Sequence, residues 1–442
     1  MSHPIDLSKI FEYLPKQDNA SPNFYKINLP ADVTSKLTYS VPPSQSPINR
    51  TNAQLPILKE IEDVVETPNT TRQIVKKKVQ TVACSPYDFK QSYEIPINRK
   101  PIGSYDTQLQ TANLKEIPQI KDIKIIGTTA LFNKKLIGIR RSIRYPLPSV
   151  SVPDFVPIEE DPIIKEISST PSEQSLRVFS TAKALASIAV CQRSVFPLDI
   201  QFKKKGNDIY VITSNNSPAI VETTLETITT QMSVQKDRMT SDFIENINET
   251  CKVNESFIQL STEGQDPIKL GDESPLPLLY RSIVIGGIEF IIRSRIDALL
   301  DAPKPNKPLK LAVCRVFNDI PTPIRKDPWM NLEDRRGTIF INEVNANSAK
   351  VARWVTLSRL IGAEKCMIGY AIRKTSNLKE PHILLGVEQH GVDKFSQEIS
   401  LTQGNVYGVL TTIFGRLKDS DDGKYLFIRD SKQRKTYSLY QI

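Results

Sequence analysis

The chain has 442 residues with 58 Lys and Arg against 49 Asp and Glu, a net charge of +9 and an isoelectric point near 9.1. No apolar run approaches the roughly 20 residues that span a bilayer, so we exclude a helical membrane protein. The first residues lack a signal-peptide pattern and the five cysteines show no CxxC spacing. We therefore expect a cytoplasmic protein with free thiols, no metal site and no cofactor.

Residues 1–120 have the composition of an extended tail. They hold one of the 17 glycines but 13 of the 31 prolines, whereas a compact domain needs glycine at turns and helix ends. Short apolar clusters such as Leu55 to Leu58 and Val64-Val65 are too small for a core but can dock on a partner. We predict a tail that becomes ordered on binding other proteins, and a plain disordered linker is the alternative.

The next segment, 121–175, reads as a basic connection. Its first part, 121–144, holds seven Lys and Arg and one acidic residue, a net charge of +6. The isoleucines among these charges suit an edge strand on which lysine blocks further pairing, or a nucleic-acid contact. Both interpretations stay open. Because this segment carries most of the net charge, it is the better candidate for a ribosome or RNA contact.

Residues 176–442 have a globular pattern of helices and strands. We predict an α+β body in which mixed sheets are flanked by helices. Gly286 and Gly287 are typical of a hairpin turn. Residues 237–275 are polar, and we predict an irregular insertion there. The predicted helices are 181–193 (capped by Ser180), 219–236, 348–361 and 404–418. The predicted strands are 198–202, 208–213, 280–286, 288–300, 309–316, 337–344, 366–373, 382–388 and two near the C-terminus.

Two strand pairs carry polar residues at a spacing of two, which places each pair on one face of its strand. The pairs are Arg295 with Asp297 and Glu343 with Asn345. A nuclease that uses Mg²⁺ would want several carboxylates and a lysine here. An arginine and an asparagine stand in two of those places, and ordinary alternation of a solvated face explains the pattern equally well.

A basic helix and a helix end are candidates for RNA binding. Lys350 and Arg353 can share a face near Trp354, which suits a phosphate chain and a stacked base. The alternative is an amphipathic helix with a solvated basic face. Arg193 and Phe196 could stack on a base in the same way, although a phenylalanine is more often a core residue.

Several segments closely resemble the d subunit of eukaryotic translation initiation factor three. They include the run NANSAKVARW, followed by a glycine-containing helix end and the dipeptide GY, and the C-terminal pattern KYLFIRD with TYSLY. The resemblance covers roughly 120–442. It implies a non-enzymatic, cytoplasmic component of the initiation factor three complex on the small ribosomal subunit. It also implies that the tail docks on neighbouring subunits, particularly the e subunit, with the c and a subunits nearby.

The resemblance further implies the fold of the 5′-end decapping and exonuclease family, with cap binding kept and cleavage lost. The Glu-x-Asp and Glu-x-Lys pairs of decapping enzymes fall on Arg295-Ile-Asp297 and Glu343-Val-Asn345, and their catalytic glutamine falls on Leu357. An arginine among metal ligands opposes Mg²⁺ by charge, so we expect a degenerate former metal site.

Cap-proximal positions of the family fall on two predicted helices, where Ala182 replaces an aspartate. The other positions are Val195, Phe196, Glu226, Thr229 and Thr230. We therefore expect a non-catalytic subunit of initiation factor three with a candidate pocket for the mRNA 5′ cap. The alternatives are a Mg²⁺-dependent RNA 5′-end hydrolase and a pure interaction scaffold that binds no cap.

Overall fold

A computed structural model describes the body of the chain and two short strands of the tail. For the strands Leu55–Leu58 and Thr81–Cys84 it describes the backbone alone. The other described residues are 100–105, 108–138, 145–150, 156–172, 174–193, 198–212, 239–319, 337, 340–341, 344, 348–372, 382–429 and 436–442.

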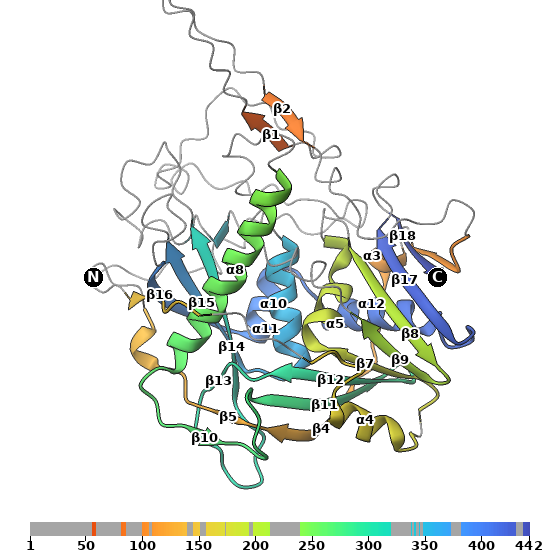
Figure 1. Cartoon of the computed structure of the whole chain (residues 1–442), viewed down its shortest axis with the longest axis horizontal. Coiled ribbons are helices and arrows are strands. Elements are labelled where there is room, and N and C mark those ends of the chain that lie inside the picture. The colour runs from red at the N-terminus through yellow and green to blue at the C-terminus, as the bar shows by residue number, and fades with distance from the viewer. Residues whose placement is uncertain are drawn as a thin grey trace, which may run out of the picture.

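The larger of two main sheets is nine-stranded and mixed (Figure 1). Strand β7 runs parallel to both of its neighbours, β9 and β12, and the other pairs are antiparallel. Strands β11 and β12 form a hairpin that turns at Gly286 and Gly287, whose φ values of 60° and 71° suit glycine. The order is β3 (Gly103–Tyr105), β18 (Tyr437–Gln441), β17 (Gly423–Arg429), β8 (Asp199–Lys205), β9 (Asp208–Ile212), β7 (Arg177–Thr181), β12 (Ile288–Arg295), β11 (Leu278–Ile285) and β4 (Gln119–Ile126).

The smaller main sheet is five-stranded, with β14 and β15 parallel at its centre. Two further sheets are two-stranded antiparallel pairs, β1 with β2 and β5 with β10. The five-stranded order is β13 (Ala298–Leu299), β14 (Leu311–Asp319), β15 (Lys365–Ile372), β16 (Ile383–Gly391) and β6 (Tyr145–Pro146). The small pairs join Leu55–Leu58 to Thr81–Cys84 and Thr128–Thr129 to Ile268–Lys269.

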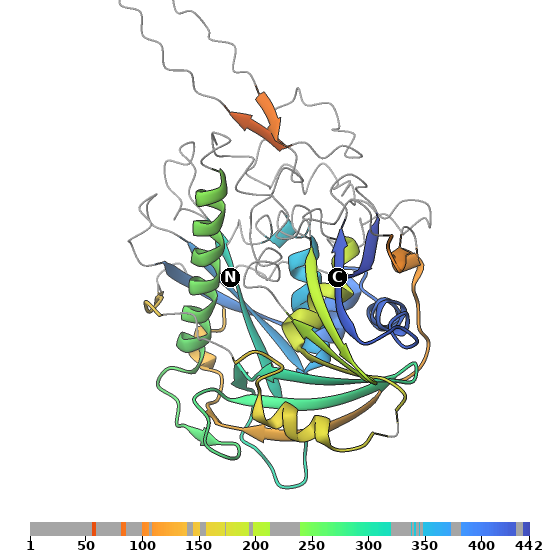
Figure 2. The same ribbon diagram turned by 45° about the vertical axis from the view of Figure 1, so that its right-hand side comes forward.

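Helices fill the space between the two main sheets and cover their outer faces (Figures 1 and 2). The principal core joins residues of both sheets to α5 (Ala182–Ala189), α10 (Ser348–Leu360) and α12 (Gln403–Gly415). Val253, Phe257 and Ile258 of α8 (Met239–Thr262) pack on the other face of the five-stranded sheet. The remaining helical elements are α3 (Gln108–Thr111), α4 (Pro162–Ser169), α11 (Val392–Glu398) and the 3-10 turns η2 (Lys134–Leu136) and η3 (Cys191–Arg193).

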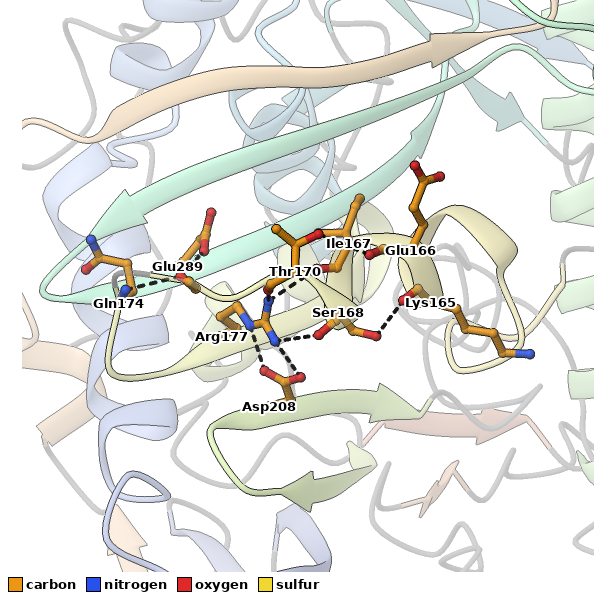
Figure 3. A network of polar contacts seen from close by, with 10 residues as sticks. Lys165, Glu166, Ile167, Ser168, Thr170, Gln174, Arg177, Asp208 and Glu289 are labelled. Atoms are coloured by element: carbon orange, nitrogen blue, oxygen red, sulfur yellow. Dashed lines mark hydrogen bonds and ion pairs between the residues drawn. The ribbon is translucent and has the colours of Figure 1, made fainter.

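A polar network fastens α4 to the outer face of the nine-stranded sheet (Figure 3). The Arg177 guanidinium pairs with Asp208 and donates to the carbonyls of Ile167, Ser168 and Thr170. A cation at the C-terminal end of a helix satisfies carbonyls that lack intrahelical partners. At the other end, Asp161 accepts from two α4 backbone amides and binds Arg293 at 2.6 Å. The network is structural.

The predicted α+β class is confirmed, and most predicted strands and the helices at α10 and α12 are present. Three local predictions are wrong. The cap of α5 is Thr181, whose Oγ1 accepts from Ala184 N at 3.2 Å, rather than Ser180. The insertion predicted at 237–275 contains the 24-residue helix α8. The predicted strand 337–344 is helical at residues 337, 340, 341 and 344, and the predicted helix 219–236 lies outside the described residues.

The boundaries expected at residues 120 and 176 do not separate tail, connection and body. Strands β3 and β4 belong to the nine-stranded sheet, and α4 packs against it. The basic segment therefore begins as the edge strand of the nine-stranded sheet. The sequence did not predict these elements, because 101–126 shows little alternation of apolar and polar residues and β4 is exposed from Gln119 to Ile123.

Candidate functional site

The candidate metal site is a buried ion pair. Asp297 follows β12, and its Oδ2 accepts from Arg315 Nη1 at 2.7 Å and from the Cys314 backbone N–H at 3.0 Å. The Asp297 and Arg315 side chains are only 5% and 4% exposed. Strand β13 pairs with β14, and this pairing brings the two residues together. The carboxylate is thus neutralised by a protein cation.

A second ion pair lies beside the first. Arg295, at the end of β12, binds Glu255 of α8 through Nη1 and Oε2. The Glu255 side chain is 6% exposed and that of Arg295 18%, so the pair closes the space between the helix and the strand. Each of the two carboxylates is therefore paired with an arginine. In the described part of the chain, no group of three His, Cys, Asp or Glu side chains could hold a metal.

Only one of the two polar pairs predicted to form the degenerate metal site, Arg295 with Asp297, lies in the described part of the chain. Glu343 and Asn345 lie outside the described residues, and position 344 between them is helical rather than extended. The adjacent strand that reaches Asp297 is β14, through Arg315, which the sequence reasoning missed. A usable signal was present, because Arg315 is the single charge in the apolar run LAVCRVF of β14.

The predicted RNA-binding face of α10 is wrong, because its side chains are buried. Lys350 is fully buried, with its ammonium 5.5 Å from the Phe317 ring centre and 5.2 Å from that of Trp354. Arg353 is 2% exposed and donates to Ser187 Oγ of α5 at 2.8 Å. Trp354 is itself buried. These cations stabilise the junction of α10 with α5 and β14 and are not available to RNA.

The other residues predicted for the catalytic and cap-binding sites are either buried or outside the described part of the chain. Leu357, at the place of the family's catalytic glutamine, is buried in the principal core, and so is Ala182. The Arg193 guanidinium donates to the carbonyls of Ile399 and Ser400 at 2.9 and 2.7 Å, so it binds η3 to the end of α11. The remaining cap-proximal positions lie outside the described residues: Val195, Phe196, Glu226, Thr229 and Thr230.

A group of exposed lysines gathers where η2 approaches the loop 301–310. The Lys304 carbonyl accepts from Lys307 N–H at 3.2 Å, with Pro305 next and Asn306 at a φ of 56°, which is the pattern of a type II turn. Asp301 pairs with Lys310 at 3.1 Å. This hydrogen bond lowers the pKa of Asp301, and the charges of Lys134 and Lys304 add to the effect. The exposed lysines are Lys134, Lys135, Lys304, Lys307 and Lys310.

His390 of β16 is a buried aromatic residue. Its ring stacks on Phe340 at 5.8 Å and packs on Phe395 at 4.8 Å between ring centres. Burial, with a smaller contribution from the charge of Lys394, lowers the pKa of His390 to about 4. The imidazole is therefore neutral near pH 7 and contributes to packing.

Comparison with known proteins identifies the class of this chain. The family model described as eukaryotic translation initiation factor 3 subunit 7 (eIF-3) matches residues 69–441. Two relatives, each named as the D subunit of eukaryotic translation initiation factor 3, come from Nasonia vitripennis and Xenopus laevis. They are 25% and 24% identical in alignments of 354 and 351 residues that cover 76% and 75% of this chain. The chain belongs to this family, as the resemblance of its sequence predicted.

The alignments cover 62% and 63% of those two relatives, so the chain spans about three fifths of their length. Among solved structures, Rai1 from S. pombe is 12% identical with a TM-score of 0.43, over 77% of this chain and 99% of that chain. Rai1 from Scheffersomyces stipitis is 10% identical with a TM-score of 0.48, over 79% and 93%. Within the described ranges, no helix has the length and apolar character that crossing a membrane requires.

Proposed function

We propose that the chain is a non-catalytic subunit of eukaryotic translation initiation factor 3 that acts in the cytoplasm on the small ribosomal subunit. The observation that carries this proposal is the match of the family model to residues 69–441. The tail is assigned to contacts with partner subunits, of which e, c and a are those that the resemblance implies.

Removal of the tail tests this assignment. Because β3 starts at Gly103, the deletion should end before Lys100, so that the nine-stranded sheet keeps its edge. We expect the shortened chain to fold, as judged by an unchanged circular dichroism spectrum, and to lose the other subunits in a pulldown. Recovery of the full set of subunits with the shortened chain would show that the body makes these contacts.

The ion pairs around Asp297 support the absence of catalysis. A Mg²⁺-dependent hydrolase needs carboxylates that can bind the ion, and here Arg315 and Arg295 already neutralise Asp297 and Glu255. Incubation of the purified chain with capped or 5′-triphosphate RNA and Mg²⁺ is expected to give no release of the 5′ end. Turnover comparable to that of a decapping enzyme would instead support the hydrolase alternative.

The exposed lysines of η2 and the loop 301–310 support an association with RNA. Lysines bind phosphate backbones through charge, so the affinity falls as salt rises. We expect Lys304→Glu with Lys307→Glu to weaken binding to single-stranded RNA and to reduce the salt slope by about 1.4, roughly 0.7 for each lost contact. The matched control reverses two exposed lysines of other elements, Lys165→Glu with Lys418→Glu. Equal effects of the two double variants would argue against a local surface.

The candidate cap pocket rests on the resemblance alone and involves Val195, Phe196, Glu226, Thr229 and Thr230. Crosslinking of this chain to a cap-labelled mRNA in assembled initiation complexes tests it. A crosslink that is competed by free cap analogue supports the pocket. Absence of any crosslink would favour a scaffold that binds no cap.

A further inference from the structure

Strand β4 is the last strand of the nine-stranded sheet. It pairs with β11 on one side, and the described part of the chain places no strand on the other side of Gln119 to Lys124. From Ile125 onward, residues 270–272 lie against the strand, and the Gly127 N–H donates to the Asp272 carbonyl at 2.7 Å. The uncovered stretch therefore presents backbone donors and acceptors that another strand could pair with.

Exposed isoleucines gather on this same stretch. Ile117, Ile120 and Ile123 are 85%, 49% and 38% exposed, and they are three of the five large apolar side chains that the described residues expose. Ile120 lies opposite Ile283 of β11. Ile123 is the extra residue where the register shifts between Tyr280 and Arg281. These three exposed side chains within seven residues give the edge an apolar area that a partner strand can cover.

Of the charged side chains beside the isoleucines, the acidic ones bind groups of the body, whereas two lysines do not. Asp122 pairs with Arg281 of β11 at 2.6 Å, and Glu116 accepts from the Gly286 backbone N–H at 2.8 Å, so both carboxylates are held within the body. Lys115 and Lys121 are exposed and form no ion pair with the residues that the structure describes. The edge therefore presents apolar and positive groups to a partner.

We propose that β4 is a docking strand for an extended acidic segment of another protein. The segment pairs with the uncovered edge as an additional strand, places apolar side chains over the isoleucines and directs carboxylates to Lys115 and Lys121. RNA fits less well, because a phosphate backbone offers nothing to cover isoleucine. A second copy of this chain also fits less well. It would bring the same lysines to the edge, and its Asp122 is already paired with its own Arg281. This surface goes beyond the proposed function, which tests for subunit contacts only in the part of the tail that precedes Lys100.

Peptide binding to the full-length chain tests the proposal. The probe is a short fluorescent peptide that alternates glutamate and valine, followed by fluorescence anisotropy at low and moderate salt. We expect binding that weakens with salt, and at least tenfold weaker binding when lysine replaces every glutamate. A peptide with a central proline is also expected to bind at least tenfold more weakly, because proline cannot donate to a neighbouring strand. Amide hydrogens of 119–124 should exchange more slowly when the peptide is bound.

Two variants and their controls locate the site. Ile120→Lys and Lys121→Glu are each expected to weaken the glutamate–valine peptide at least tenfold. Val156→Lys changes another exposed apolar side chain, and Lys165→Glu reverses an exposed lysine elsewhere, so neither should alter binding. All four positions are exposed, and thermal unfolding curves check that the variants fold.

Three results would overturn the proposal. The first is no peptide binding, or binding that the β4 variants and the controls change equally. The second is self-association of the chain that Ile120→Lys abolishes, which would make a second copy the occupant. The third is a loss of RNA binding in Lys121→Glu while peptide binding is unchanged, which would make the edge an RNA contact.

Discussion

Removal of the Asp297 carboxylate is the most informative perturbation of the candidate site. Asp297→Ala leaves Arg315 without this carboxylate in a place where both side chains are at most 5% exposed. It also removes the acceptor of the Cys314 backbone N–H. Breaking a buried ion pair by removing one partner destabilises a protein by about 3–5 kcal/mol. We therefore expect the free energy of unfolding to fall by about that amount.

Urea unfolding followed by tryptophan fluorescence measures this change. The double variant Asp297→Leu with Arg315→Met replaces the pair by apolar groups of similar volume. Such a replacement is often neutral or stabilising, so we expect it to recover most of the loss. The control is Asp301→Ala, which breaks the pair with Lys310, whose side chains are 47% and 51% exposed, and should leave unfolding unchanged. If Asp297→Ala behaves like the control, the carboxylate is not neutralised by Arg315 as described.

The remaining predictions concern buried groups and one glycine. Burial lowers the pKa of His390 to about 4, so the unfolded chain binds the proton more readily below pH 6.5. The free energy of unfolding should therefore fall by on the order of 3 kcal/mol between pH 6.5 and pH 4, and His390→Phe should remove that part of the slope in urea titrations. Arg353→Met should lower the free energy of unfolding by about 2 kcal/mol and leave RNA affinity unchanged in filter binding, because the side chain is buried against Ser187. If Arg353→Met weakened RNA binding, α10 would be part of the RNA-binding surface after all. Gly362→Ala should lower the thermal midpoint, because the free energy of unfolding falls by about 1–3 kcal/mol. Residue 362 has a φ of 67°, and a Cβ would lie 2.2 Å from Arg281 Nη1. An unchanged midpoint would show that this loop can move aside.

Local patterns predicted those parts of the fold that local interactions decide. The hairpin of β11 and β12 follows from two apolar runs joined by Gly286 and Gly287, and the structure uses both glycines at positive φ. The predicted strands 198–202 and 208–213 likewise pair as β8 and β9, with a turn at Gly206, whose φ is 60°. Helix α8 was missed because its composition is polar. Its apolar residues Val253 and Phe257 recur at helical spacing and pack on β14.

The nature of the candidate site could not be predicted in the same way, because its partners come from distant parts of the chain. Asp297 meets Arg315 only once β13 pairs with β14, and Arg295 meets Glu255 only once α8 covers that sheet. The charge of Lys350 suggested a solvated face, but the side chain is fully buried, with its ammonium over the rings of Phe317 of β14 and Trp354. Sequence spacing identifies which side chains share a face, and the tertiary contacts decide whether that face meets solvent.

The proposed role as a subunit of initiation factor 3 can be measured directly in cells. The measurement is sedimentation of lysate from cells that express the tagged full-length chain, followed by mass spectrometry of each fraction. We predict that the chain migrates with the other initiation factor 3 subunits and with the small ribosomal subunit. Recovery of the chain only in the light fractions, with none of these subunits enriched in its pulldown, would contradict this role.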